Sequence, residues 1–425
     1  METNSSQPEP SFGDDPSAVV DWRGLGDLFA LTTERLTASV EGVHRAIAGR
    51  WFGLAGPRAA SLGNGYQAIT SRIYGSVRLA ASGLGALVGM GAEVSNRRGR
   101  LRPLWRSPRG SSVQAVANAL WGDHLEQHGS ALRIEMGLRD RSGRPIGLDR
   151  ETLARVFSHP TSRLVVLLHG LGETERCFLE KGENGEAAGS LGDVLAVDLF
   201  TPLLVRYNTG RSVSDNGRAL AALLNAMYRD WPAPIEEIAL VGNSMGGLVA
   251  RSAAYAGRNV GHEWVGATRH LVAIGTPHLG APLEKGAELV SRGLRIAPES
   301  RPIGEFLDGR SVGIKDLRVG SIGDMDGPGV EDGERIDDAA IDTPFPDHVQ
   351  QHFVAGVVTE HAGHPIGVLV GDLIVRTASA TGRGRRRTID ATHVRIVGKR
   401  RHSDLAGDPT VHRQIREWLA TEPAT

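Results

Sequence analysis

Short uninterrupted apolar runs recur in the middle of the chain and alternate with stretches whose apolar residues repeat at helical spacing. Residues 164–168 and 238–241 are runs of this kind, which is typical of parallel strands covered on both faces. Between them, residues 215–228 carry apolar side chains on one helical face. The alternation predicts an α/β class with a mostly parallel sheet and helices on both faces. Further strands are expected at 203–207, 271–275, 353–358 and 393–398, after an opening hairpin formed by 132–138 and 145–148.

The region before this sheet has a different pattern. Residues 1–18 are polar and rich in acidic residues and proline, which predicts a disordered leader. Residues 19–110 form a helical region in which Leu36, Val40, Val43 and Ile47 recur at helical spacing. Residues 79–92 lack charge but are too few to span a bilayer, and arginines follow them from Arg97 to Arg109. Two interpretations stay open: a helical arm packed on the rest of the chain, or a contact with an anionic membrane surface.

Residues 111–425 are expected to form one α/β domain, interrupted by an insertion at about 281–347. That insertion has few periodic apolar positions and lies between two predicted core strands. It is therefore a candidate cap over a functional site at the edge of the sheet. Its acidic residues do not have the spacing of an EF-hand loop, and we expect a solvated acidic segment with no metal.

Composition excludes several other classes of protein. The 425 residues have 40% hydrophobic content and a formal net charge of -1, which suits a large core and gives no reason to expect nucleic acid. The leader has no apolar segment of a secretory signal, and Cys177 is the only cysteine. We therefore expect a reducing, cytoplasmic location, with peripheral membrane contact as the alternative, and a buried core thiol at Cys177. No cofactor motif is recognised: the glycines at 83, 85 and 89 have the wrong spacing for a nucleotide loop.

The candidate chemistry is centred on Ser244. This residue follows an apolar strand in the pattern Gly242-Asn-Ser-Met-Gly246 and precedes a helical stretch, which is the pattern of a nucleophile elbow. Gly242 and Gly246 leave room for the tight turn that exposes the serine hydroxyl. The five-residue pattern is weak evidence by itself, so its context matters.

The upstream context supplies a candidate oxyanion hole. The strand at 164–168 runs into His169-Gly170-Leu171-Gly172, a glycine-rich loop that follows it directly. Preorganised backbone N–H groups stabilise the charge that develops on a carbonyl oxygen during acyl transfer. The expected donors are the N–H groups of Leu171 and Met245.

The partners of the serine should follow it along the chain, in the order acid and then histidine. Of the later histidines, His402 lies between the predicted last strand and the predicted last helix, where such a base belongs. His270 is expected to begin a strand, and His412 to lie on a solvated helix surface.

For the acid we choose Asp372, which follows the apolar segment 366–370. Its alternative interpretation is an ordinary turn aspartate. Asp390 is the second candidate, but it precedes the strand leading to His402 and so should lie at the wrong end of the sheet. Asp404 is too close to His402 in sequence to orient its ring.

These segments resemble a known family. Residues 371–380, 394–398 and 402–405 resemble the end of small bacterial lipases and of lipase-like relatives of the GPI inositol-deacylases, and residues 242–247 and 275–280 resemble their elbow and following strand. Over residues 160–420 the resemblance implies an α/β-hydrolase fold, the triad Ser244, Asp372 and His402, and the same two oxyanion donors. One departure is Lys399-Arg-Arg401, where such lipases carry small or apolar residues, which predicts a more cationic mouth.

The sequence therefore predicts a serine hydrolase that cleaves small-molecule or lipid esters without a cofactor. Two alternatives stay open. One is acyl transfer or amide hydrolysis by the same triad. The other is a non-catalytic scaffold that binds a membrane or polymer surface through its N-terminal helices.

Overall fold

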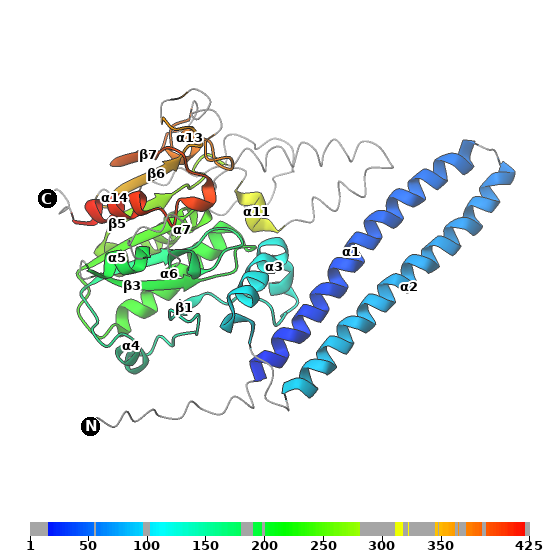
Figure 1. Cartoon of the computed structure of the whole chain (residues 1–425), viewed down its shortest axis with the longest axis horizontal. Coiled ribbons are helices and arrows are strands. Elements are labelled where there is room, and N and C mark those ends of the chain that lie inside the picture. The colour runs from blue at the N-terminus through cyan, green and yellow to red at the C-terminus, as the bar shows by residue number, and fades with distance from the viewer. Residues whose placement is uncertain are drawn as a thin grey trace. The chain divides into compact units, whose positions relative to one another are not determined.

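The computed structural model describes residues 16–54, 57–96, 103–179, 190–197, 200–280, 311–317, 322, 345–346, 348–361, 364, 371–384 and 388–420. The leader up to residue 15, the arginines at 97–102, most of the insertion at 281–347 and the apolar segment 366–370 lie outside these residues. The chain divides near Ser111 into two compact units, one built on a helical hairpin and the other on a sheet (Figure 1).

The helical unit contains two long antiparallel helices, α1 (Pro16–Leu54) and α2 (Pro57–Asn96). A buried carboxylate links them: Glu41 of α1 accepts hydrogen bonds from Ser71 at 2.8 Å and Arg78 at 2.7 Å, both on α2. Burial by itself would raise the pKa of Glu41, but these hydrogen bonds and that of Arg45 lower it below its usual value. Among the described residues, no helix has the length and hydrophobicity needed to cross a bilayer.

The second unit is built on a seven-stranded sheet with strand order β1-β3-β2-β4-β5-β6-β7. Only β1 runs antiparallel to its neighbour, and the other pairs are parallel. The strands are β1 (Gly137–Arg139), β2 (Arg163–Leu168), β3 (Phe200–Arg206), β4 (Glu237–Asn243), β5 (Thr268–Ile274), β6 (Gln350–Gly356) and β7 (His393–Val397). The largely parallel sheet predicted from the apolar runs is confirmed.

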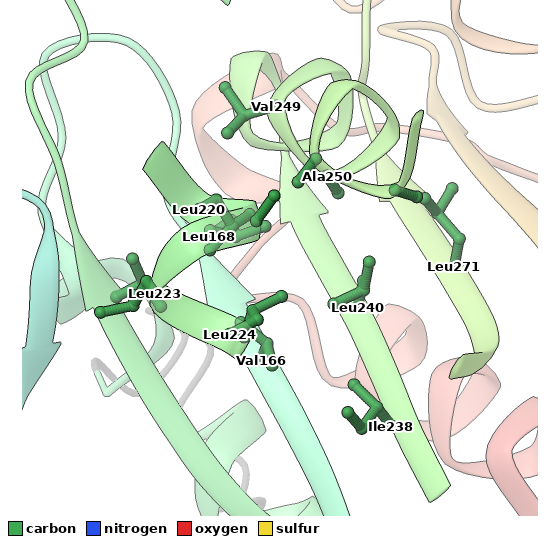
Figure 2. Close-up of a cluster of buried hydrophobic side chains, with 14 of the residues drawn as sticks. Val166, Leu168, Leu220, Leu223, Leu224, Ile238, Leu240, Val249, Ala250 and Leu271 are labelled. Carbon is green, nitrogen blue, oxygen red and sulfur yellow. The ribbon is translucent and has the colours of Figure 1, made fainter. Parts of the chain in front are cut away.

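Both faces of this sheet are covered, which is why its strands lack polar alternation. Val166 and Leu168 pack with α6 (Val213–Asp230) and α7 (Met245–Asn259), as Figure 2 shows for part of this cluster. Val165 and Leu167 face the opposite cluster, to which α5 (Leu191–Val197) and α14 (Pro409–Ala420) contribute. Successive strand residues point to opposite faces, so both must be apolar when both faces are buried. This arrangement is the predicted α/β-hydrolase fold.

The other helices of the described residues precede β1, lie between strands or follow β7. They are η2 (Leu104–Arg106), α3 (Pro108–Gln127), α4 (Arg150–Val156), η3 (Glu175–Phe178), α8 (Trp264–Ala267), α11 (Val312–Asp316), α13 (Thr377–Ala380) and η4 (His402–Asp404), where η marks a 3-10 helix.

Three details of the sequence interpretation are wrong. The return strand expected at 145–148 is reduced to a single bridge between Arg139 and Pro145. His412 is buried, and its Nε2 lies 2.7 Å from the carbonyl oxygen of Ala406, because the ring closes the turn that precedes α14. Cys177 is only partly buried at the edge of the core.

A row of histidines crosses three neighbouring strands. Nδ1 of His270 lies 3.1 Å from Nε2 of His352, and Nδ1 of His352 lies 3.2 Å from Nδ1 of His393. The His352 ring also stacks on Trp418 of α14, with 4.8 Å between ring centroids. Burial lowers the pKa of His270 to about 4 and that of His352 to about 3, and neighbouring positive charges or imidazoles add to both shifts.

These shifts predict that the sheet unit loses stability in mild acid. Both imidazoles stay neutral in the folded protein at pH 5, whereas in the unfolded chain their pKa is about 6.5 and they bind protons. The stability that these two neutral imidazoles contribute to the folded protein is fully present above pH 6.5 and is lost as the pH falls toward 4. The free energy of unfolding should fall by about 1.4 kcal/mol per pH unit for each such histidine.

Denaturant titrations between pH 7 and pH 4.5 would measure this slope. His352→Phe keeps a ring against Trp418 but cannot bind a proton. It should reduce the slope by about 1.4 kcal/mol per pH unit, the contribution of one histidine. His159→Gln, at an exposed histidine outside the row, should leave the slope unchanged. An identical slope in wild type and His352→Phe would contradict the assignment.

Candidate active site

Ser244 lies in a strained turn between β4 and α7. Its backbone has φ 51° and ψ −117°, a conformation that costs a non-glycine residue on the order of 1–3 kcal/mol. The surrounding structure holds this turn: the Ser244 N–H donates to the carbonyl oxygen of Ile274 at 2.7 Å. The serine hydroxyl therefore lies at the carboxyl edge of the sheet, before the first turn of α7.

The two glycines of the elbow are required by close backbone contacts. A Cβ at Gly242 would lie 2.3 Å from the carbonyl carbon of Gly246, and a Cβ at Gly246 would lie 2.2 Å from the carbonyl oxygen of Leu168. No side chain fits at either position without a backbone shift. The elbow thus packs directly against the end of β2.

The structure brings His402 and Asp372 to this serine. His402 begins η4 after β7, and its Nε2 lies 2.9 Å from Ser244 Oγ. Its Nδ1 lies 2.7 Å from Oδ2 of Asp372. Because an ionised carboxylate only accepts hydrogen bonds, Nδ1 carries the proton and Nε2 is left to accept from the serine hydroxyl.

Asp372 is fixed from several directions. Its side chain is buried, and Oδ1 accepts the backbone N–H groups of Ile374 at 3.0 Å and Val375 at 2.8 Å. This tight turn places Leu373 at φ 83°. The backbone carbonyl oxygen of Asp372 also accepts the N–H of His402 at 3.1 Å. The acid therefore orients both the ring and the backbone of the histidine.

The loop that carries the acid is attached to the loop after β5. Ser379 of α13 donates its hydroxyl to the carbonyl oxygen of Gly280 at 2.8 Å and accepts the N–H of Leu279 at 3.0 Å. No sequence pattern indicates this attachment, because a single serine side chain makes it.

The other two acid candidates lie elsewhere. Asp390 lies before the amino end of β7, where its carbonyl oxygen accepts a hydrogen bond from the side chain of Gln351. Asp404 caps η4, and its Oδ2 accepts the N–H of Arg401 at 3.1 Å. Neither carboxylate occupies the position that Asp372 holds against His402.

The charge expected at residues 399–401 is partly neutralised. Arg400 forms an ion pair with the buried carboxylate of Asp408, and Lys399 pairs with Glu360 at 2.8 Å. Burial by itself would raise the pKa of Asp408, but the hydrogen bond and charge of Arg400 lower it. The cationic character predicted for this turn is thus reduced.

The side chain and backbone of His169 make contacts that hold the candidate oxyanion loop in place. Its buried ring stacks on Tyr207 with centroids 4.4 Å apart, and the Tyr207 hydroxyl donates to the His169 carbonyl oxygen at 2.6 Å. Nδ1 lies 3.0 Å from the Gly170 carbonyl oxygen, and Nε2 accepts the N–H of Tyr207 at 3.4 Å. Burial lowers the pKa of His169, so the neutral ring has a structural role in this loop.

The loop itself continues through Leu171 and Gly172. Gly172 has φ 70°, and its N–H donates to the Thr209 hydroxyl at 3.2 Å. Leu171 is half-buried, and Met245 is the first residue of α7, where N–H groups have no acceptor within the helix. Both N–H groups thus belong to segments adjoining Ser244.

Two further carboxylates near this loop were missed by the sequence interpretation. Glu173 accepts hydrogen bonds from Gly170 and Asn243. Glu175 of η3 forms a buried ion pair with Arg206 of β3, with distances of 2.7 Å and 2.5 Å. Burial by itself would raise the pKa of Glu175, but the hydrogen bond and charge of Arg206 lower it. The run Glu173-Thr-Glu175 directly after a glycine-rich loop is the only signal that could have indicated them.

Within the described residues, no group of three or more histidine, cysteine, aspartate or glutamate side chains is arranged to hold a metal ion. The acidic residues of the predicted insertion, from Asp324 to Asp338, lie outside that part of the chain.

Comparisons with known proteins find partial similarities. The family model described as PGAP1-like alpha/beta domain matches residues 203–298, which include the elbow. A mature lipase from Bacillus licheniformis aligns at 18% identity and TM-score 0.41, covering 68% of this chain and 98% of that chain. An esterase from Pyrococcus furiosus aligns at 15% identity and TM-score 0.34, covering 61% and 81%. A lipase from Staphylococcus hyicus aligns at 14% identity and TM-score 0.33, covering 61% and 95%. The sequence comparison with curated proteins finds no match.

The close packing of the elbow predicts that Gly246→Ala is strongly destabilising. A methyl group 2.2 Å from the Leu168 carbonyl oxygen forces a backbone shift, which should cost about 1–3 kcal/mol or more. Chemical denaturation at pH 7 would measure this loss. Gly266→Ala is the control, because a Cβ there meets nothing within 4 Å. Equal stability of the two variants would contradict the steric explanation.

Proposed function

We propose that the protein is a serine hydrolase that cleaves carboxylic esters through Ser244, His402 and Asp372. The observation that carries the proposal is the continuous contact from Asp372 Oδ2 through His402 to Ser244 Oγ, with distances of 2.7 Å and 2.9 Å. A nucleophile, a base within hydrogen-bonding reach and a group that orients the base are the parts needed for acyl transfer by a serine.

In the proposed first step, Nε2 of His402 accepts the hydroxyl proton as Ser244 Oγ attacks the ester carbonyl carbon. Asp372 stabilises the imidazolium and keeps its ring in place. The N–H groups of Leu171 and Met245 stabilise the negative oxygen, and the N-terminal end of α7 adds a positive partial charge. The imidazolium then returns the proton to the leaving alcohol oxygen.

In the second step, the same groups act on water. His402 accepts a water proton while the water oxygen attacks the acyl-enzyme carbonyl, and the returned proton releases Ser244 and the carboxylic acid. The acyl chain and the alcohol of the substrate are not specified by these residues. The proposal is therefore ester hydrolysis as a reaction class.

Substitution of the triad tests this function directly. Ser244→Ala should abolish turnover of short p-nitrophenyl esters and labelling by a fluorophosphonate, because no nucleophile is left. Asp372→Asn should lower kcat by about 1,000- to 10,000-fold, because an amide favours the histidine tautomer that cannot accept the serine proton.

The control is Ser142→Ala, at an exposed serine of the turn after β1, which should keep full activity. Circular dichroism should show that all three variants fold. Turnover or labelling retained by a folded Ser244→Ala protein would remove this serine from the mechanism.

A second candidate function is attachment to an anionic membrane surface through α2. Residues 79–92 carry no charge, and Leu79 is 75% exposed and Leu87 58% exposed. The other large apolar residues exposed on this segment are Leu84, Val88 and Met90. The chain continues from α2 into the arginine-rich sequence that ends at Arg109, and such arginines favour anionic lipid headgroups.

Vesicle sedimentation with the full chain tests this attachment. The protein should bind vesicles with phosphatidylglycerol more strongly than neutral phosphatidylcholine vesicles. Leu84→Ser with Leu87→Ser should weaken binding about tenfold or more, because exposed leucines supply the apolar contact. Ala80→Ser, on the same helix, is the control. Equal binding by the double variant and the control would argue against the α2 surface.

A further inference from the structure

The two proposed oxyanion donors come from separate segments, and their spacing has to be held. Leu171 belongs to the loop after β2, and Met245 belongs to the elbow after β4. Productive sites hold such groups within about 0.5 Å of the required geometry. The contacts of Glu173 join these two segments at Gly170, directly before Leu171, and at Asn243, two residues before Met245.

One carboxylate oxygen makes both contacts. Oε2 of Glu173 accepts the backbone N–H of Gly170 at 2.8 Å and the side-chain N–H of Asn243 at 2.9 Å. Gly170 directly precedes Leu171, and the buried Asn243 directly precedes Ser244. Hydrogen bonds to an ionised acceptor are shorter and stronger than those between neutral groups.

A backbone hydrogen bond also closes the turn from Gly170 to Glu173. The N–H of Glu173 donates to the carbonyl oxygen of Gly170 at 3.2 Å, so the carboxylate is held by its own turn before it reaches Asn243. A Cβ at Gly170 would lie 2.9 Å from Glu173 Oε2 and 3.1 Å from Ser244 Cβ. The absence of a side chain at Gly170 therefore permits both the carboxylate and the elbow to approach its backbone closely.

We propose that Glu173 is a positioning residue that holds the oxyanion loop against the elbow. This inference rests on the proposed function. Its role depends on the acceptor oxygen: a negative charge beside the site opposes the charge that develops on the substrate oxygen, whereas the two hydrogen bonds keep the donors aligned. The N–H of Gly170 is occupied by this contact, which leaves Leu171 and Met245 as the donors.

A variant with a neutral acceptor of the same shape shows whether the geometry of Glu173 or its charge affects kcat. Glu173→Gln keeps one side-chain oxygen that accepts both N–H groups, and it should retain kcat within about threefold. Glu173→Ala removes the acceptor and should lower kcat on a short p-nitrophenyl ester about 10- to 100-fold, with KM changed less than about threefold. Glu151→Ala, at an exposed glutamate of α4, is the control for loss of one negative charge.

A double-mutant cycle tests the contact itself. Asn243→Ala should lower kcat by a factor similar to that of Glu173→Ala, and the double variant should be no worse than either single variant, because both remove one connection. Fluorophosphonate labelling rates should follow the same order. Thermal unfolding under the assay conditions checks that each variant is folded.

The outcomes separate this inference from the proposed function. If wild type hydrolyses esters and Ser244→Ala does not, the function stands and the Glu173 series is informative by itself. Unchanged kcat in a folded Glu173→Ala protein, or an equal loss in Glu173→Gln, would overturn the positioning role. A wild type that neither hydrolyses esters nor reacts with a fluorophosphonate would overturn both proposals.

Discussion

The close approach of the β4–α7 turn to the end of β2 is the constraint on which the site depends. Gly246 lies against the Leu168 carbonyl oxygen so tightly that a Cβ would be 2.2 Å from it. This contact brings the serine turn beside the loop that begins at His169, although the two segments are far apart in sequence. The strain at Ser244 is tolerated because the end of β4 and the first turns of α7, from Met245 to Ala254, are buried. A rigid core therefore fixes a conformation that an isolated turn would not keep.

The remaining parts of the site come from parallel strand ends at one edge of the sheet. The loops after β2, β4 and β7 carry Leu171, Ser244 and His402, and the turn at Asp372 is joined to His402 through both side chain and backbone. Polar side chains hold the loops at this edge together: Glu173 connects the loop after β2 with the elbow after β4, and Ser379 connects the segment after Asp372 with the loop after β5. The sheet supplies approximate placement, and individual hydrogen bonds supply the final alignment.

The sequence predicted the features that have a strong local or periodic cause. Strands buried on both faces appear as apolar runs, and an elbow requires glycine on both sides of its serine, so the sheet and Ser244 could be located. Asp372 and His402 were proposed from chain order, and in the structure Asp372 contacts His402, which in turn contacts Ser244. Long-range pairs were not predictable: the contact of Glu173 with Asn243, and the burial of His412 against Ala406, depend on loop conformations with no periodic pattern. A hairpin was expected near Pro145, but the structure has only one bridge there. The sequence pattern does not distinguish a single bridge from a pair of strands.

The buried pair of Glu175 and Arg206 constrains how this protein diverges. Replacing one partner leaves an uncompensated charge in the core, which costs about 3–5 kcal/mol, whereas replacing both with apolar residues of similar volume is often neutral. Since η3 follows the loop that adjoins Ser244, this ion pair connects the candidate site to the carboxyl end of β3. Evolutionary drift at these two positions should thus be correlated, with both members kept or both exchanged in a given lineage.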